Sequence, residues 1–292
     1  MSAVYSGGPI TVGNFLADSS SNLVEGVRTK LLLSNWTDVS GSVGDRIMQS
    51  VETPQGLQCR VRMYHSGAEL STRFSFRDTA ASPRTMDVFF APNRGRVPTV
   101  RIIANPYQFF LFYPYVLHEA RTFIAGGCPK IEDFQASVVT TAIWCQGNAT
   151  NDTNTVGGMR SFRETGSTRG ADHWGSLFND FTPYSTGTGI GAQRITFHQP
   201  ATHPIASSVG YPSVWGETLE AIKDPARIAW GLSSGSVASR ILGPIWDAVA
   251  IGECYPSGLQ STFDGHIHEN ITTDYFNLQG NHIRFSLWVA VT

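Results

Sequence analysis

Two neighbouring segments of this chain alternate polar and apolar residues along their whole length. Residues 57–64 read Leu-Gln-Cys-Arg-Val-Arg-Met-Tyr, and residues 70–77 repeat the pattern as Leu-Ser-Thr-Arg-Phe-Ser-Phe-Arg. Successive side chains of a β-strand point to opposite faces, so a period of two predicts strands with one face buried. Two further strands are predicted at 86–91 and 99–104, because Gly, Pro and Asn residues mark turns between them.

Residues 107–113 read Tyr-Gln-Phe-Phe-Leu-Phe-Tyr and are apolar on both faces of a strand. Such a strand is buried on both sides by its own chain, or on one side by a neighbouring subunit. The second possibility makes its aromatic residues candidates for an interface. Arginines on the polar faces of the two alternating strands could pair with carboxylates across the same boundary. The candidate interface residues are therefore Tyr107, Phe109, Phe110, Phe112, Arg60, Arg62, Arg73 and Arg77.

A different period governs the N-terminal part of the chain. Its apolar residues recur mostly at spacings of three and four, which places them on one face of an α-helix. Asn14 or the polar run 18–22 could cap or interrupt this helix. The residues that define the apolar face are Val12, Phe15, Leu16, Leu23, Val27 and Leu31.

The second half of the chain holds shorter signals. Strands are predicted at 195–198, 227–230 and 245–251, a short helix at 236–242, and a buried final strand at 283–291. The fold class that these patterns favour is α+β. It consists of an N-terminal amphipathic helix packed on predominantly antiparallel β-sheet structure, with long polar loops.

We expect residues 1–292 to form a single α+β structural domain. The stretch 146–172 is rich in Gly, Asn and Thr without a hydrophobic period, so it is interpreted as a long polar loop and the internal boundary. A second polar stretch covers 183–193. The first residues lack the basic start and apolar core of a signal peptide, and no apolar run is long enough to span a membrane.

The charge content is low for a protein with a fully wetted surface. Only 15% of the residues are charged, against roughly 25% in typical soluble proteins, which suggests that much of the surface faces other protein. Lysine occurs only at positions 30, 130 and 223, and arginine suits interfacial pairing better than lysine does. A coding bias toward arginine would produce the same count. A net charge of −2 argues against specific nucleic-acid binding.

Gly231-Leu232-Ser233-Ser234-Gly235 matches the G-x-S-x-G motif of serine hydrolases. Acids follow at Asp247 and Asp264, and histidines at 266, 268 and 282, in the order that a catalytic triad requires. Too few residues separate Ser233 from these acids for the parallel strands of that fold. We therefore expect Ser233 to be inert.

His266 and His268 would share one face of a strand, so their imidazoles could reach one metal ion, with Glu269 or Asp264 nearby. One chain supplies too few ligands, whereas a threefold axis would bring six imidazoles together. The alternative is a solvated turn after Asp264-Gly265, and this is the interpretation that we favour. We expect no catalytic residue, no cofactor and no bound metal, and hence a protein that is not an enzyme. The four cysteines form no CxxC pair and are expected to be thiols.

Five short segments carry a resemblance to known proteins. The chain resembles virion structural proteins of tailed bacteriophages, from the neck and tail region. Its N-terminal part is similar to tail-terminator proteins, which form a ring between the tail tube and the neck. The segments are Tyr5-Ser6-Gly7-Gly8-Pro9, Ala104-Asn105-Pro106-Tyr107-Gln108-Phe109-Phe110, Leu242-Gly243-Pro244-Ile245-Trp246-Asp247-Ala248, Phe263-Asp264-Gly265-His266 and Ser286-Leu287-Trp288-Val289-Ala290.

The resemblance implies a structural, non-catalytic subunit of a homo-oligomeric ring or shell at the neck or tail. Its expected partners are copies of itself and other phage tail, neck or baseplate proteins, with no specific nucleic acid and no membrane. Its expected location is the virion, after synthesis in the host bacterial cytoplasm. A glycan-binding fibre or baseplate module is the alternative, and a serine hydrolase comes third. The glycan-binding module would use Trp174, Tyr184, Tyr211 and Trp215.

Overall fold

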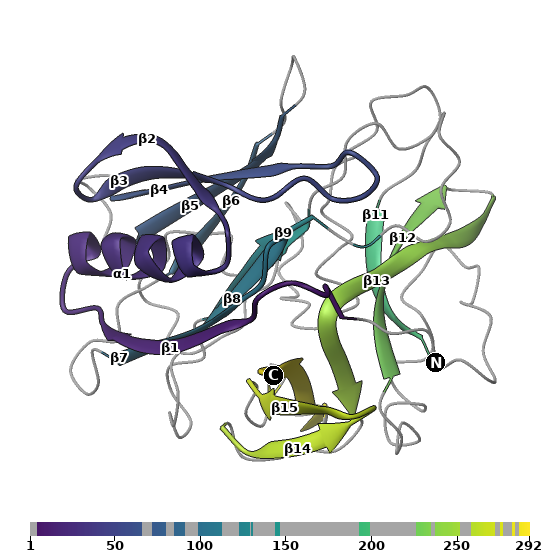
Figure 1. The fold of residues 1–292 in the computed structure, drawn as a ribbon. Coiled ribbons are helices and arrows are strands. Elements are labelled where there is room, and N and C mark those ends of the chain that lie inside the picture. The colour runs from purple at the N-terminus through teal and green to yellow at the C-terminus, as the bar shows by residue number, and fades with distance from the viewer. Residues whose placement is uncertain are drawn as a thin grey trace.

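A computed structural model gives the fold of this chain (Figure 1). Antiparallel strands form four sheets in the described residues, together with one α-helix. No helix in that part is long and apolar enough to cross a membrane. The described residues are 5–65, 72–79, 85–90, 99–112, 123–128, 130, 144–146, 193–198, 226–234, 237–251, 258–271, 275–276, 282–283 and 286–292.

Two five-stranded sheets make up the N-terminal half. In sheet A the strand order is β1 (Thr11–Leu16), β7 (Thr99–Ala104), β8 (Gln108–Phe112), β9 (Phe123–Gly127) and β10 (Trp144–Gln146). In sheet B the strands follow the chain order, as β2 (Thr37–Ser42), β3 (Asp45–Gln49), β4 (Cys59–His65), β5 (Thr72–Asp78) and β6 (Thr85–Phe90).

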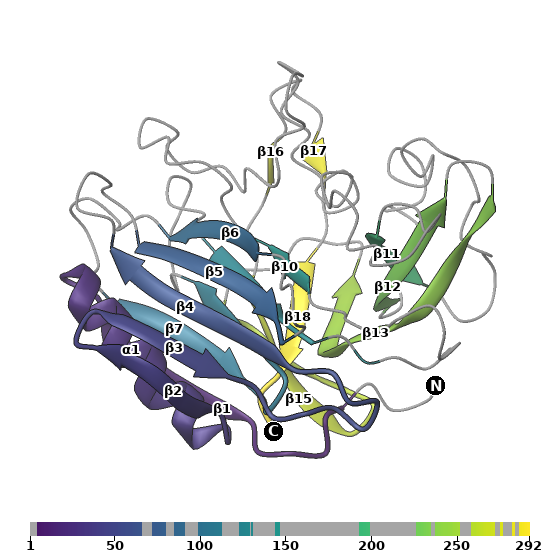
Figure 2. The ribbon, with the colours of Figure 1, turned by 90° about the horizontal axis from the view of Figure 1, so that it is seen from above.

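The C-terminal half contributes a six-stranded sheet C and a two-stranded sheet D. The order in sheet C is β11 (Gln193–His198), β12 (Ala226–Ser234), β13 (Val237–Ile251), β18 (Ser286–Ala290), β15 (His266–Asn270) and β14 (Gln260–Phe263). Sheet D pairs β16 (Tyr275–Phe276) with β17 (His282–Ile283). Figure 2 shows sheet B nearest the viewer, with strands β11, β12 and β13 of sheet C to its right.

The helix α1 (Ser20–Leu33) lies between strands β1 and β7 of sheet A and strands β2 and β3 of sheet B (Figure 1). Ser19 caps it, because its side chain accepts a hydrogen bond from the backbone N–H of Asn22 at 3.2 Å. The chain leaves the helix through Asn35, whose φ of 66° lies in the left-handed region. The side chains that α1 buries are Leu23, Val24, Val27 and Leu31.

The inner faces of sheets A and B meet in an aromatic core. The ring of Phe109 lies 5.6 Å from that of Phe76, 6.3 Å from that of Phe74 and 5.9 Å from the Trp36 indole. Such offset and tilted arrangements are the ones that aromatic rings prefer. The alternating strands therefore bury their apolar faces here, as their sequence predicts. Other fully buried members of this core are Met48, Cys59, Val61, Met63, Val100, Ile102 and Leu111.

The opposite face of sheet A is covered as well. All five residues of β8 are buried, including Phe110 and Phe112 on the face that points away from Phe109. On that face the amide Nε2 of Gln108 donates to the carbonyl oxygen of Trp246 in β13. Part of sheet C thus lies against sheet A on the side away from sheet B, and the second face of β8 is buried within the chain itself.

The expected fold class, α+β with an N-terminal amphipathic helix packed on a sheet, is wrong. The part of the chain that the structure describes is mainly antiparallel β-structure with a single helix. Val12, Phe15 and Leu16 lie in strand β1, which pairs with β7. Their spacing fits a helical face, but pairing with β7 supplies backbone hydrogen bonds that override this weak local preference.

A second local prediction is also wrong. Residues 236–242 were expected to form a short helix, but residues 237–242 belong to the long strand β13, which pairs with β12 and β18. The strands predicted in the N-terminal half correspond to β4, β5, β6, β7 and β8, within two residues at most boundaries. Nearly all of the polar stretches 146–172 and 183–193 lies outside the described residues. Cys59 and Cys128 are buried thiols, whereas the side chains of the other two cysteines lie outside the description.

The contact between the two core sheets yields a stability prediction. A Cβ atom at Gly126 would lie 2.5 Å from Cε1 of the buried Phe76 ring. We expect Gly126→Ala to lower the free energy of unfolding by about 1–3 kcal/mol, as overpacking of a core does. Urea denaturation followed by circular dichroism measures this loss.

A double variant tests whether the contact with the Phe76 ring causes this loss of stability. Phe76→Leu removes ring atoms that the new methyl group would meet, so Gly126→Ala should cost less in that background than in the native one. Equal losses in the two backgrounds would contradict the proposed contact.

Candidate functional site

The five segments that carry the sequence resemblance meet at one place, the junction between sheets A and C. The ring of Tyr107 stacks on the Trp246 indole at 4.7 Å, and Phe263 contacts Trp288 edge-on at 5.3 Å. The first segment joins them because Tyr5 packs on a buried pair formed by Trp288 and Val249. Residues from both ends and the middle of the chain thus form one cluster, which we call the junction.

Asn105 is the centre of this junction, and its side chain is buried. Its Oδ1 accepts hydrogen bonds from the backbone N–H groups of Tyr107 and Gln108, both at 2.9 Å, and so shapes the turn between β7 and β8. Its Nδ2 donates to Oδ2 of Asp247 at 2.6 Å. Its carbonyl oxygen accepts from the Trp36 indole at 2.8 Å. One residue therefore links the end of α1, sheet A and sheet C.

Asp247 is a buried carboxylate in strand β13, with a left-handed φ of 56°. Besides Asn105, the backbone N–H of Ser6 donates to its Oδ1 at 2.7 Å. Burial raises the pKa of Asp247, although these hydrogen bonds to the carboxylate oppose the rise. The carboxylate holds the N-terminal segment against sheet C. A buried polar group with two donors is satisfied rather than poised for chemistry.

The N-terminal segment also contacts the histidines of β15. The ring of Tyr5 stacks on that of His266 at 3.5 Å, and its hydroxyl donates to the carbonyl oxygen of Phe263 at 3.1 Å. The same hydroxyl lies 3.4 Å from Nε2 of His268. Burial, with the charges of Asp264 and Asp247, raises the pKa of Tyr5 to about 12. Burial lowers the pKa of His268 to about 4, so this imidazole is neutral at pH 7.

An ion pair adds a third connection across the junction. The guanidinium of Arg101 in β7 donates through Nε and Nη2 to the two carboxylate oxygens of Glu269 in β15. Glu269 is almost fully buried, so its charge requires this bidentate partner. Its Oε2 accepts a further hydrogen bond from Gln260 at 3.3 Å.

The metal hypothesis finds no support at these histidines. The His268 ring is completely buried, and its Nδ1 lies 3.0 Å from the carbonyl oxygen of His266. A ring covered by its own chain cannot meet its copies at a threefold axis. Among the residues that the structure describes, no group of three or more His, Cys, Asp or Glu side chains could hold a metal ion.

Ser233 does not lie on the turn that a hydrolase nucleophile requires. It belongs to β12, which pairs antiparallel with β11 and β13, and Ser234 pairs with Val237 where β12 meets β13. No helix follows the motif, since residues 237–251 continue as a strand. The register pairs Ala229 with Pro244 and Arg227 with Val249, so Asp247 lies near Ile228, about five residues or roughly 16 Å along β12 from Ser233.

The predicted interface residues fall into two groups. Phe109, Phe110 and Phe112 are at most 2% exposed and lie within the core of the chain, and Tyr107 stacks on Trp246. In this conformation their rings are covered by the chain itself rather than offered to a neighbour. The four arginines lie elsewhere.

Those arginines, together with Tyr64, line the outer face of strands β4 and β5, which we call the arginine face. The cross-strand register pairs Arg60 with Arg77 and Tyr64 with Arg73, so each pair shares this face. Arg62 is 48% exposed and donates to both carboxylate oxygens of Asp45, at 3.0 and 2.7 Å. The hydrogen bonds from Arg62 lower the pKa of Asp45. Figure 2 looks onto this side of sheet B.

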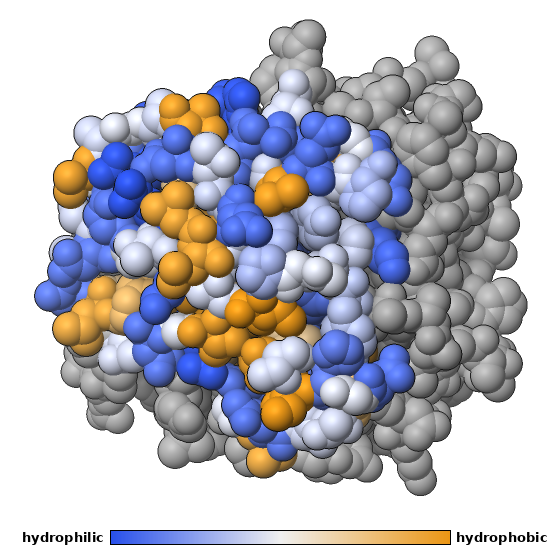
Figure 3. Space-filling view, viewed as in Figure 1, coloured by the Kyte–Doolittle hydropathy of each residue, from blue (hydrophilic) through white to orange (hydrophobic). Residues whose placement is uncertain are grey.

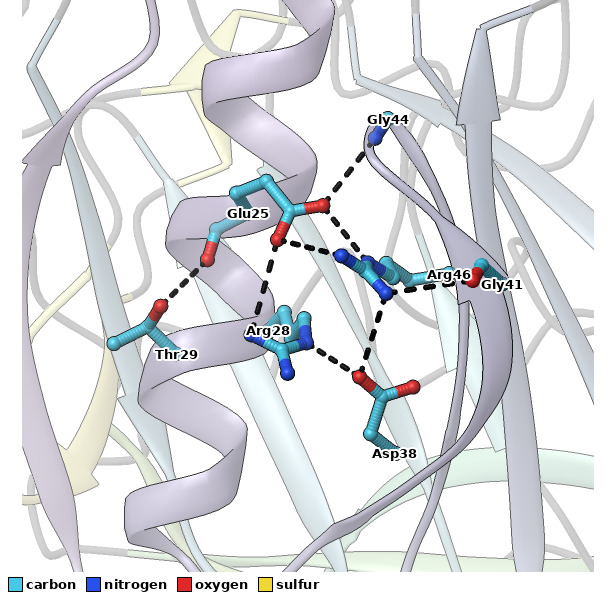
Figure 4. Close-up of polar contacts among 7 residues, drawn as sticks. All are labelled: Glu25, Arg28, Thr29, Asp38, Gly41, Gly44 and Arg46. Carbon is cyan, nitrogen blue, oxygen red and sulfur yellow. Dashed lines mark hydrogen bonds and ion pairs between the residues drawn. The ribbon is translucent and has the colours of Figure 1, made fainter.

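An ion-pair network fixes α1 to the β2–β3 hairpin (Figure 4). Glu25 on the helix accepts from Nε of Arg46 at 2.8 Å and from the backbone N–H of Gly44 at 3.3 Å. Arg28 on the helix donates to Asp38 of β2 at 2.5 Å. Burial would raise the pKa of Glu25, but the hydrogen bonds from Arg46 and Gly44 lower it overall. The hairpin therefore forms one surface with the helix.

That surface carries exposed apolar side chains, which together we call the helix face. Val43 is 73% exposed, Leu16 61% and Leu33 60%, so more than half of each side chain meets solvent. Figure 3 shows hydrophobic groups gathered over the side that carries α1 and β1, between hydrophilic ones. The members of the helix face are Leu16, Leu32, Leu33, Val39 and Val43.

Sequence reasoning missed the roles of Asn105, Asp247 and Tyr5, although each lies in a segment that carries the resemblance. An Asn-Pro pair after a strand indicates a turn, but it does not reveal a partner 142 residues away. No protein-family model matches this chain, and no curated protein shows significant sequence similarity to it.

The hydrogen bonds of the junction predict that a single substitution at Asn105 lowers the free energy of unfolding strongly. Asn105→Ala removes the donor to Asp247 and the acceptor for two backbone N–H groups. We expect the free energy of unfolding to fall by about 3 kcal/mol or more, because buried polar groups are left unsatisfied. Urea denaturation monitored by tryptophan fluorescence measures this.

Asn14→Ala is the matched control. Its Oδ1 accepts one hydrogen bond from Arg101 at 3.2 Å on the exposed part of β1, and the expected loss is below about 1 kcal/mol. If the two variants lose similar amounts, Asn105 is not the centre that the geometry indicates.

Proposed function

We propose that this protein is a non-catalytic structural subunit that assembles with copies of itself. The observation that carries the proposal is the helix face, where five apolar side chains are exposed on a surface braced by ion pairs. Scattered exposed apolar residues are normal, but here they lie on one helix and the strands beside it. Rigid, partly apolar surfaces of this kind are typical of protein–protein contacts.

The low charge content supports the same function. A chain with 15% charged residues has fewer groups with which to cover a free surface, and association would cover part of the rest. The junction supports it in another way, because Asp247, Glu269 and His268 are engaged in contacts that hold the sheets together. These titratable groups stabilise the packing of the sheets and so fix the shape of the chain. A subunit of an assembly needs such a fixed shape.

The setting that we propose is the virion of a tailed bacteriophage, in a ring or shell at the neck or tail. The sequence resemblance supports this setting, and other neck, tail or baseplate proteins would be the neighbours. The subunit would be made in the host bacterial cytoplasm.

The helix face gives the test of self-association. We expect the wild-type chain to form a closed oligomer at micromolar concentration, with more than roughly 1,000 Å² buried per contact. Leu33→Asp combined with Val43→Asp places two charges on the helix face and should yield a monomer. Light scattering after size-exclusion chromatography gives the mass of each species.

Leu259→Asp is the matched control, since Leu259 is an exposed leucine beside the β14–β15 hairpin, outside the helix face. This variant should keep the wild-type mass. A wild-type chain that stays monomeric throughout the micromolar range, or an oligomer that survives the double substitution, would count against the proposal.

A further inference from the structure

Strand β1 is an edge of sheet A, and none of the described strands pairs with its second side. It pairs with β7 along its whole length, through six consecutive residues without a register shift. Figure 1 shows β1 on the near side of the molecule, and the view from above in Figure 2 places it at the margin of sheet A. The side of β1 that points away from β7 is therefore an open strand edge.

The register shows which backbone groups of β1 point outward. Successive residues of a strand turn their N–H and C=O groups to opposite sides. The backbone N–H of Asn105 donates to the carbonyl oxygen of Gln108 and so faces β8, which means that the preceding residue, Ala104, faces β1. Thr11 pairs with Ala104, so Thr11 and every second residue after it face β7. The residues of β1 that face outward are Val12, Asn14 and Leu16.

This edge lacks the features that usually prevent strands from pairing with other chains. Proteins protect an open edge with charged side chains, proline, bulges or a short strand. Strand β1 has six residues, with no charged residue and no proline among them. Among the other edge strands that the structure describes, β10 and β14 are shorter, whereas β2, β6 and β11 each include a charged residue. The sequence of β1 thus favours pairing with a further strand.

Two charged side chains that contact β1 lie over its faces and not along its open edge. The side chain of Lys30 on α1 lies against Gly13, where a Cβ atom would be 2.6 Å from Nζ. On the opposite face, Nη1 of Arg101 donates to Oδ1 of Asn14 at 3.2 Å, and the same guanidinium is paired with Glu269. Neither charge lies in the path of a strand that adds to the edge.

The sequence of β1 is complementary to itself about Asn14. In an antiparallel copy centred on this residue, Asn14 meets its own counterpart and Val12 lies opposite Leu16. Gly13 then lies opposite Phe15, and an aromatic side chain beside an edge glycine stabilises a sheet. Leu16 is 61% exposed, so the apolar pair would cover a side chain that now meets solvent. A two-fold axis brings no like charges together here, because β1 carries none.

We propose that β1 pairs with β1 of a second copy of this chain around a two-fold axis. Five strands from each copy then form one continuous sheet A, and the outward N–H and C=O groups of Val12, Asn14 and Leu16 all gain partners. Leu16 also belongs to the helix face, so the paired strands would continue that surface. The inference deepens the proposed function by naming the backbone contact of self-association, and it rests on that function.

Two substitutions at Asn14 test the pairing, with sedimentation velocity from nanomolar to micromolar concentration as the measurement. Asn14→Pro removes an outward N–H that does not bond to β7, and proline is tolerated at such edge positions. We expect it to weaken self-association about tenfold or more, because the symmetric contact loses the same hydrogen bond twice. Asn14→Ala keeps the N–H and should leave the affinity within about threefold. Circular dichroism and thermal unfolding verify that both variants are folded.

Hydrogen exchange of the wild-type chain tests the pairing without a substitution. The amides of Val12, Asn14 and Leu16 should exchange about tenfold or more faster after dilution to the monomer, because their partners then leave. The amides of Gly13 and Phe15 bond to β7 and should stay protected at both concentrations. If the outward amides exchange at one rate in oligomer and monomer, no second copy pairs with this edge.

The same measurements distinguish this inference from the proposed function. A two-fold contact requires an even number of chains in the assembly. An odd number of chains, or an oligomer that the folded Asn14→Pro variant leaves intact, would contradict the pairing of β1 and leave self-association through the helix face standing. A wild-type chain that is monomeric throughout the micromolar range would contradict self-association itself, and the pairing of β1 with it.

Discussion

The hydrogen bonds of Asn105 join the parts of this molecule that lie furthest apart in sequence. Its carbonyl oxygen holds Trp36 at the end of α1, its Oδ1 shapes the turn into β8, and its Nδ2 reaches Asp247 in sheet C. Asp247 in turn binds the backbone N–H of Ser6. These groups are buried, so each bond is worth more than it would be in water, and each loss leaves an unsatisfied partner. The placement of sheet C against sheet A follows from this cluster.

All five residues of β8 are buried within the chain, so this aromatic strand is an interior element. Phe109 lies in the core with Phe74 and Phe76, while Gln108 on the opposite face meets Trp246 of the same chain. Surfaces that could take partners therefore lie on the periphery. The helix face, with its exposed leucines and valines, is one such peripheral surface.

The sequence predicts short-range features of this fold and misses long-range ones. The period of two in residues 57–64 and 70–77 reports directly which faces are buried, so β4 and β5 are found. Val12, Phe15 and Leu16 lie in β1 rather than in a helix, because their backbone partners are in β7, more than eighty residues later. The apolar run of β8 predicts that both faces of this strand are buried. The sequence does not show whether a neighbouring subunit or the rest of the chain buries the second face, and the structure shows that the chain itself does. Of the candidate interface residues, Arg62 is exposed and the other three arginines are half-buried, whereas the phenylalanines are interior.

The central claim is that this chain covers both faces of sheet A by itself. Hydrogen exchange of the β8 backbone amides tests it, measured across a dilution series from high micromolar to nanomolar concentration, together with the mass of the protein at each step. We expect β8 to stay equally protected at every concentration, because the residues that cover it belong to the same chain. Protection that falls as the protein dissociates would contradict the claim, since a neighbouring subunit would then supply the missing layer.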